Sequence, residues 1–334
     1  MIISWCCVFI GIFFVRFWLK QMWITRNILD YDDKIVPFDI LNKMSLLCGI
    51  SYLDPRDIAR MKKKEKTNLS QRAHQMIDDI EGSVELDDRI HFIDTSHVDD
   101  GIFAECYVWI KEKERAIYLI VRGTDTLEDW QVNFDIRTNQ ILKDVGFNVH
   151  KGFMRQFESI EPFITKTLLA HRHEYDKVII TGHSLGGSVS TIATIYYNEY
   201  FSGNVPIYLY TFGCPRVGDK KMGDYMRTQL KTFDHCWRVY DFEDPVPMIP
   251  LRPEFEHIHC NTLCLYDEKV LHTSKKDVKW PFRFLTFLAC PSLLKPVAKH
   301  TINHYAKSLR VHMRAQQMRP LALANSLSNL LVGK

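Results

Sequence analysis

The chain has 334 residues, of which 46% are hydrophobic and 25% charged, with 15 glycines and 13 prolines. These proportions lie near globular averages and exclude a collagen-like or intrinsically disordered chain. Because 43 lysines and arginines face 40 acidic residues, the net charge is only +3, which argues against nucleic acid as the main ligand. The length fits either two domains or one large α/β domain with additions.

The nine cysteines are an odd number and lack the paired spacing of metal ligands. Scattered cysteines in a long chain are typical of reduced thiols in a protein that faces the cytosol. We therefore expect neither a disulfide framework nor a metal, and no cofactor.

Residues 1–20 predict a transmembrane or signal-anchor helix. Positions 1–15 carry no charge, Arg16 interrupts the run, and three more apolar residues follow it. A bilayer span needs ~20 mostly apolar residues, and an arginine near one end can reach the headgroups. A cleaved signal peptide would carry a basic leader and a small-residue cleavage site, and a buried soluble helix would carry a polar stripe. Basic residues follow the run at Arg16, Lys20, Arg26 and Lys34. The positive-inside tendency therefore predicts a single-pass anchor with the rest of the chain in the cytosol.

Residues 21–100 read as a helical extension with a basic stretch. Apolar residues at helical spacing predict an amphipathic helix over 37–53. The stretch 56–72, which includes the run 61–66 (MKKKEK), is interpreted as a solvated loop. The alternative is a patch that is attracted to anionic lipid near the anchor.

From about residue 103, short β-rich runs alternate with longer helical ones. The expected strands are 106–110, 117–122, 178–181, 207–212 and 237–240, and the expected helices are 153–172 and 185–201. This alternation predicts a mostly parallel sheet covered by helices, an α/β catalytic domain over 101–312. A C-terminal tail, 313–334, follows it, and basic and apolar residues from 305 onward predict a surface helix that ends at Pro320.

The segment 182–187 (GHSLGG) lies between a predicted buried strand and a predicted helix. A serine on so sharp a turn needs small neighbours two residues away, and its hydroxyl then stands exposed at the sheet edge. The amide of Leu185 and the positive end of the helix dipole face the same point, where they could hold a developing oxyanion. This pattern favours Ser184 as a nucleophile over Ser184 as a plain helix cap.

A serine nucleophile requires a base and a carboxylate, which in this architecture follow it in the order Ser, Asp or Glu, His. The acidic cluster 241–244 (DFED) stands at the carboxyl end of a predicted strand. Asp244 is favoured because Pro245 holds it extended, with Asp241 or Glu243 as alternatives. Six histidines follow: His257, His259, His272, His300, His304 and His312. Chemistry alone does not choose among them, and His300 and His304 would share one face of a helix.

Five blocks follow one another along the chain: 117–130 (IYLIVRGTDTLEDW), 149–153 (VHKGF), 181–187 (TGHSLGG), 211–218 (TFGCPRVG) and 244–247 (DPVP). Together, in this order, they resemble the class 3 (fungal-type) lipases of the α/β-hydrolase fold. The resemblance covers roughly residues 100–310. A further block, 255–259, looks like a family strand, although His259 departs from the family pattern.

The resemblance implies Ser184 as nucleophile, Asp244 as the orienting carboxylate, and Thr124 with Leu185 as oxyanion donors. It places the base a few residues before an aromatic residue, which favours His300 ahead of Tyr305, with His304 as the alternative base. It also implies a short amphipathic lid helix over 125–140, for which a core-facing turn is the alternative.

These expectations describe a membrane-anchored serine lipase or esterase, a carboxylic ester hydrolase acting on glycerolipids through a Ser-His-Asp triad and an acyl-enzyme. The expected partners are a lipid acyl ester and, through residues 1–20, a membrane; the sequence predicts no oligomeric state. An acyltransferase or thioesterase with the same triad, and a catalytically silent membrane scaffold, are the alternatives.

Overall fold

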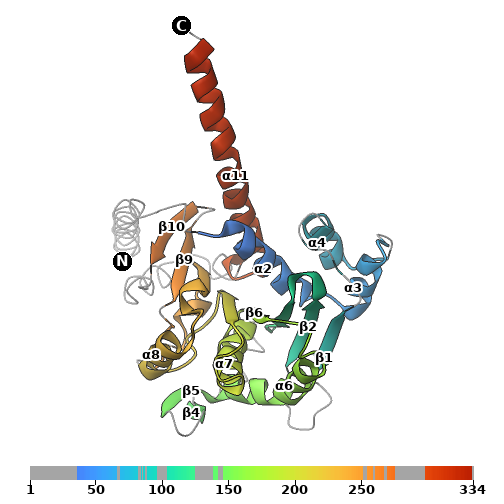
Figure 1. Ribbon diagram of the computed structural model, residues 1–334, viewed down its shortest axis with the longest axis vertical. Coiled ribbons are helices and arrows are strands. Elements are labelled where there is room, and N and C mark those ends of the chain that lie inside the picture. The colour runs from blue at the N-terminus through green and yellow to red at the C-terminus, as the bar shows by residue number, and fades with distance from the viewer. Residues whose placement is uncertain are drawn as a thin grey trace, which may run out of the picture.

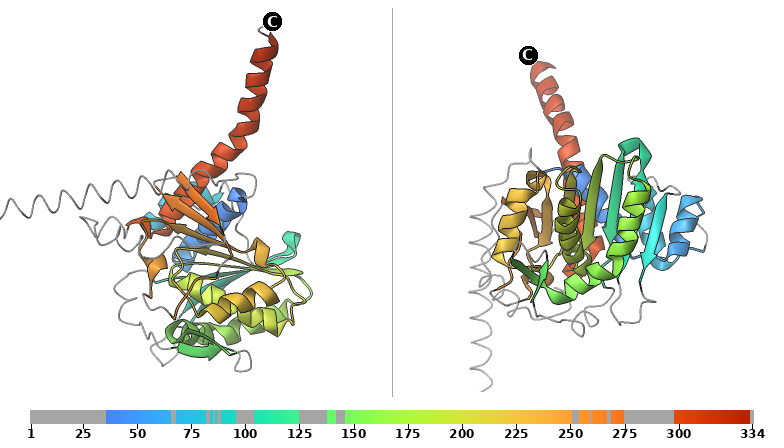
Figure 2. Two further views of the ribbon diagram at one scale, coloured as in Figure 1. Left: turned by 90° about the vertical axis from the view of Figure 1, so that its left-hand side faces the viewer. Right: turned by 60° about the horizontal axis from the view of Figure 1, so that its bottom comes forward.

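A mixed β-sheet crosses the centre of the molecule, and helices cover both of its faces (Figures 1 and 2). The computed structural model describes residues 36–65, 68–81, 84, 86, 89–95, 104–124, 138–141, 146–250, 254–258, 260–266, 269–274 and 298–332.

Eight strands of the described residues form the sheet, in the spatial order β1-β2-β3-β6-β7-β8-β9-β10. Their bounds are β1 Ile90–Asp94, β2 Glu105–Lys111, β3 Ala116–Val121, β6 Lys177–His183, β7 Ile207–Phe212, β8 Trp237–Asp241, β9 Asn261–Tyr266 and β10 Lys269–Ser274. The pairs from β3 to β9 are parallel, whereas β1, β2 and β10 join antiparallel at the edges. Every residue of β3 is buried, as expected for a strand covered on both faces. A separate antiparallel pair joins β4 (Thr138–Ile141) and β5 (Phe147–His150).

The helices form one layer on each side of the sheet. Helices α6 (Lys151–Ala170), α7 (Leu185–Tyr200) and α8 (Lys220–Gln229) contribute to the hydrophobic core on one face. Helices α2 (Phe38–Ile50), α3 (Pro55–Lys62), α4 (Gln71–Glu81) and α11 (Ile302–Val332) contribute to the core on the other. Short 3-10 turns occupy η2 (Glu112–Glu114), η3 (Phe233–His235) and η4 (Val246–Met248). The predicted α/β architecture with a mostly parallel central sheet is confirmed.

The sheet uses strands on both sides of the predicted boundary at residue 101. Strand β1 pairs with β2, although β1 lies before that boundary. Helix α2 also shares a core with strands of the catalytic segment. The extension thus packs as a layer of the same structure.

The loop predicted over 56–72 is wrong in part, because Pro55–Lys62 forms helix α3 and α4 begins at Gln71. Asp54 starts α3: its side chain accepts the amide of Arg56 at 2.7 Å, and Pro55 occupies the first helical position. The lysines Lys63 and Lys64, which follow α3, are exposed as expected.

Two further sequence predictions are wrong. Helix α11 runs through Pro320 to Val332 and projects from the body of the molecule (Figure 1). A proline removes one backbone donor and crowds one carbonyl, but here alanine, leucine, glutamine and arginine surround it and favour the helix on both sides. The strand predicted over 255–259 is also not found among the described residues of that range. Glu256 forms a single isolated bridge with Gly218, and the next strand, β9, begins at Asn261.

The predicted anchor, residues 1–20, and most of the predicted lid, 125–137, lie outside the described residues. Among the residues that are described, no helix is both long enough and apolar enough to cross a bilayer.

Candidate active site

The turn between β6 and α7 holds Ser184 in an unusual backbone conformation. Its φ of 58° and ψ of −130° lie where residues with a Cβ atom are rarely found. A Cβ atom added to Gly182 would lie 2.3 Å from the carbonyl oxygen of Gly186, and one added to Gly186 would lie 2.3 Å from that of Val121. Both glycines are therefore required by backbone contacts, as the sharp-turn interpretation expects.

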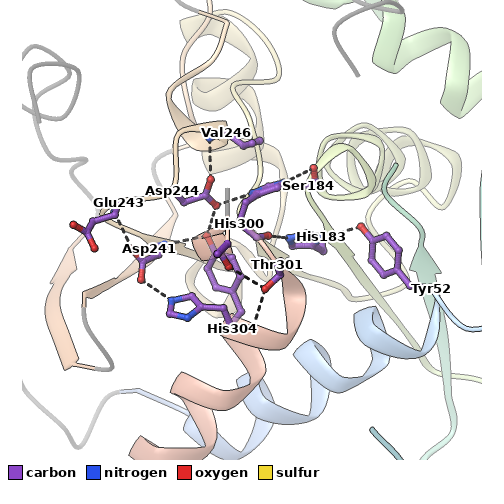
Figure 3. Close-up of polar contacts among 12 residues, drawn as sticks. Tyr52, His183, Ser184, Asp241, Glu243, Asp244, Val246, His300, Thr301 and His304 are labelled. Carbon is purple, nitrogen blue, oxygen red and sulfur yellow. Dashed lines mark hydrogen bonds and ion pairs between the residues drawn. The ribbon is translucent and has the colours of Figure 1, made fainter. Parts of the chain in front are cut away.

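A chain of hydrogen bonds starts at this serine (Figure 3). The Oγ atom of Ser184 lies 2.8 Å from Nε2 of His300, and Nδ1 of His300 lies 2.8 Å from Oδ2 of Asp244. The three side chains are buried, and they come from the β6–α7 turn, the segment before α11 and the loop after β8. Because β3, β6 and β8 run parallel, their carboxyl ends bring these loops to one edge of the sheet.

Two groups besides His300 hold the carboxylate of Asp244. Its Oδ1 accepts the amide of Val246 at 2.9 Å, and its Oδ2 accepts the hydroxyl of Tyr305 at 2.6 Å. Burial raises the pKa of Tyr305 well above its ordinary value, and the charges of Asp244 and Asp241 add to this effect. Tyr305 therefore stays a proton donor, and it fixes the oxygen that faces His300.

The alternative base, His304, lies in a separate pair. Its Nε2 is 2.8 Å from Oδ2 of Asp241, whereas it is His300 that reaches Ser184. The hydroxyl of Tyr305 connects the two pairs, because it accepts the amide of Asp241 at 3.0 Å and donates to Asp244. The alternative carboxylate Glu243 enters this network through its amide, which donates to Asp241 Oδ1 at 2.8 Å. Of the candidates, the structure thus brings His300 and Asp244 to Ser184.

The other candidate histidines lie elsewhere. Nε2 of His257 is 2.6 Å from the carbonyl oxygen of Pro247, and the ring of His312 stacks on Phe38. His272 lies on β10, and His259 is outside the described residues.

Of the predicted oxyanion donors, Leu185 follows the serine directly along the chain, and Thr124 follows a glycine that approaches it. Leu185 is the first residue of α7, where a helix leaves its amides without partners inside the helix. Thr124 follows Gly123, and a Cβ atom added to Gly123 would lie 3.3 Å from Cβ of Ser184. The chain after β3 therefore passes close to the nucleophile and brings Thr124 into its neighbourhood.

Sequence reasoning missed several residues that shape this site. Gly213 has a φ of +57°, and a Cβ atom there would lie 3.0 Å from Asp244 Oδ2 and 3.1 Å from His300 Nδ1. His183 contacts the backbone carbonyl of His300, and Tyr52 in turn contacts the ring of His183 (Figure 3). The motif letters contained His183 and Gly213, but only the packing reveals what they touch. No sequence signal pointed to Tyr52.

Among the described residues, no group of three or more His, Cys, Asp or Glu side chains is arranged to hold a metal ion.

Residues 118–254 match the family model described as lipase (class 3). This part of the chain is similar to the class 3 lipases. The match contains Ser184 and Asp244, whereas His300 lies beyond it, so His300 is placed at the site by the structure.

Curated relatives match this chain over a limited length. A secreted mono- and diacylglycerol lipase from Fusarium solani is 32% identical over 146 residues, 43% of this chain and 42% of the relative. A lipase from Rhizomucor miehei is 29% identical over 143 residues, 42% of this chain and 39% of the relative. The chain therefore spans about two fifths of the length of these relatives.

Solved structures share the fold. A native propeptide complex of Rhizomucor miehei lipase superposes with a TM-score of 0.54 at 20% identity, covering 76% of this chain and 78% of that one. A lipase from Yarrowia lipolytica gives a TM-score of 0.57 at 16% identity, covering 81% and 93%. At these identities the likeness concerns the fold.

Proposed function

We propose that this protein is a serine lipase or esterase that hydrolyses acyl esters of glycerolipids. The observation that carries the proposal is the hydrogen-bonded series Ser184–His300–Asp244 at the carboxyl end of β6. Ser184 is buried and its backbone is strained, and its Oγ lies 2.8 Å from a histidine whose other nitrogen contacts a buried carboxylate. This arrangement favours transfer of the serine proton to the histidine. The match of residues 118–254 to the class 3 lipase model supports a lipid ester as the substrate.

The proposed reaction proceeds through an acyl-enzyme. Ser184 Oγ attacks the ester carbonyl carbon while His300 Nε2 takes its proton, and Asp244 stabilises the imidazolium that forms. The tetrahedral intermediate breaks its bond to the alcohol oxygen, which receives the proton from His300. Water then attacks the acyl-enzyme with His300 again as the base, and it releases the fatty acid and restores Ser184.

The negative oxygen of each tetrahedral intermediate needs donors. The amide of Leu185 at the positive end of α7 and the amide or hydroxyl of Thr124 are the proposed donors. Loss of one such donor typically costs ~10²–10³ in kcat.

Labelling with an active-site fluorophosphonate tests the nucleophile. The full chain should be labelled, and Ser184→Ala should lose labelling together with all but ~10⁻⁴ or less of the esterase activity. An unlabelled wild-type chain, or equal labelling of Ser184→Ala, would refute the proposal.

A matched pair of histidine variants tests the base. His300→Ala should lower kcat by ~10⁴ or more, because no other group then accepts the serine proton. His304→Ala keeps the His300 pair and should retain activity within about tenfold. If His304→Ala instead lowers kcat far more than His300→Ala does, His304 is the base.

The proposal extends to location: residues 1–20 anchor the protein in a membrane, with the catalytic segment on the cytosolic side. The uncharged run and the basic residues after it support this location. The Fusarium relative is named as secreted, so the location needs its own test.

A lipid panel with and without residues 1–20 provides that test. The full chain should sediment with membranes and cleave lipid esters in vesicles, whereas the shortened chain should stay in the supernatant and keep activity on a soluble ester. If the shortened chain still sediments fully, residues 1–20 are not the anchor.

A separate assay, in which an alcohol is added and the products are measured, tests the acyltransferase alternative. If more acyl groups are transferred to the alcohol than to water, the protein is an acyltransferase.

A further inference from the structure

The residue before the nucleophile, His183, uses both of its ring nitrogens (Figure 3). Its Nε2 lies 2.6 Å from the backbone carbonyl oxygen of His300, and its Nδ1 lies 2.8 Å from the hydroxyl of Tyr52. The side chain is 4% exposed, and its ring lies 4.7 Å, centroid to centroid, from the ring of His300. His183 thus joins the segment of the proposed base to a residue 131 positions earlier than itself.

These contacts determine the tautomer of His183. A backbone carbonyl can only accept, so Nε2 must carry a proton. Burial lowers the pKa of His183 well below its ordinary value, and the neighbouring His300 lowers it further. The neutral ring holds a single N–H proton, so Nδ1 accepts and the Tyr52 hydroxyl donates. The result is a directed series from Tyr52 through His183 to the carbonyl of His300.

A neutral His183 also suits the chemistry. His300 becomes positively charged during the proposed reaction, and a second charge 4.7 Å away would oppose this step. The hydroxyl of Tyr52 satisfies Nδ1 without adding charge. It therefore stabilises the form of His183 that leaves the imidazolium of His300 unopposed.

Tyr52 is held firmly enough to act as the start of this series. It lies two residues after the end of α2 and is 9% exposed. The guanidinium groups of Arg72 and Arg122 lie 5.6 Å and 5.7 Å from the centre of its ring. A Cβ atom on Gly123 would lie 2.4 Å from the Tyr52 hydroxyl, so this glycine leaves the space that the hydroxyl needs.

We propose that Tyr52 and His183 are positioning residues, which act through the backbone of His300 to place its ring between Asp244 and Ser184. The inference rests on the proposed function. Through Tyr52, the segment after α2 takes part in the active site, although it lies far outside the matched family region. The same segment follows the predicted membrane anchor along the chain.

The variant Tyr52→Phe removes the hydroxyl and keeps the aromatic ring. We expect kcat to fall by about tenfold with KM within about twofold, since misplacement of a catalytic group affects the reaction more than substrate binding. The matched control is Tyr107→Phe: Tyr107 is 2% exposed, and its hydroxyl has no hydrogen-bond partner among the described residues. The control should keep wild-type kcat.

A double-mutant cycle tests whether Tyr52 acts through His183. In a His183→Phe background, Tyr52→Phe should change kcat by less than about twofold, because the acceptor of the hydroxyl is already absent. Nitrogen-15 NMR of the histidine rings supplies a second readout: wild-type His183 should be the neutral Nε2–H tautomer, and Tyr52→Phe should shift the resonance of Nδ1, which loses its donor, while Nε2 stays protonated.

Three results would overturn the inference: wild-type kcat in Tyr52→Phe, full additivity in the cycle, or an Nδ1–H tautomer in the wild type. Each is distinct from failure of the proposed function. If the wild-type chain is not labelled by fluorophosphonate, the proposed function fails; if it is labelled while Tyr52→Phe equals wild type, only the positioning role fails.

Discussion

At the scale of single residues, the site depends on the absence of a side chain at Gly213. Gly213 follows β7 with a φ of +57° and leaves room for the contact between His300 Nδ1 and Asp244 Oδ2. A methyl group there would press on both atoms from about 3 Å. The position therefore admits little besides glycine, for steric reasons at the site and for conformational ones in the backbone.

We predict that Gly213→Ala lowers kcat by ~10² or more while the protein still folds. The added methyl separates the carboxylate from the imidazole, and the positive φ costs about 1 kcal/mol. Gly203→Ala is the control, because Gly203 has a similar φ of +64° but the nearest atom to its added Cβ is 3.8 Å away on Lys231. Esterase kinetics and thermal unfolding of both variants check this, and equal activity in the two would contradict it.

The depressed pKa of His183 makes the free energy of unfolding depend on pH. In the unfolded chain His183 titrates near pH 6.5, while the folded chain keeps it neutral to lower pH. Below pH 6.5 the unfolded state therefore binds more protons, and stability is lost as pH falls.

We predict that His183→Gln flattens this dependence. The slope of unfolding free energy against pH should differ between wild type and variant by up to about 1.4 kcal/mol per pH unit at acidic pH. Urea titrations between pH 4.5 and 7.5 measure both slopes. Parallel curves would show that His183 titrates alike in the folded and unfolded chains.

At the scale of elements, α2 connects the extension to the sheet. Its apolar side faces a core shared with β3, β7 and α11, and the thiol of its Cys48 contacts the hydroxyl of Thr181 on β6 at 3.2 Å. Its end also directs the chain toward Tyr52. The helix is therefore part of the support of the active site.

We predict that Leu47→Ala destabilises the protein by about 2–5 kcal/mol, since Leu47 is fully buried. The control on the same helix is Ile40→Ala, whose side chain is 39% exposed and whose loss should cost much less. Denaturant unfolding of the two variants provides the comparison. Similar losses in both would contradict the packing of α2 on the sheet.

At the scale of the whole molecule, two hydrophobic cores enclose the sheet and also bury thiols. The six described cysteines are buried: Cys48, Cys106, Cys214, Cys236, Cys260 and Cys264. Burial raises the pKa of Cys48 to about 12 and that of Cys214 to about 11. Buried thiols of this kind act as small apolar groups and react slowly.

We predict that a thiol reagent such as dithionitrobenzoate modifies the folded protein at most at the three remaining cysteines, Cys6, Cys7 and Cys290. Unfolding in guanidinium should expose all nine. Mass spectrometry after labelling counts the modified sites. Rapid labelling of Cys48 or Cys214 in the folded chain would contradict the packing.

The α/β alternation, the strand-to-helix turn around Ser184 and the acidic cluster after β8 could all be predicted from the sequence, because local patterns of apolar residues, glycines and prolines encode them. The two wrong predictions, at 56–72 and at Pro320, also have local causes. At 56–72 the helix cap outweighs the charge run, and around Pro320 strong helix formers outweigh the proline. Which histidine contacts the serine depends instead on tertiary packing. His300 and His304 are four residues apart, and only the packing of α11 shows that one reaches Ser184 and the other Asp241. The contact between Tyr52 and His183 likewise appears only in the folded structure, because contacts between residues 131 positions apart leave no local pattern in the chain.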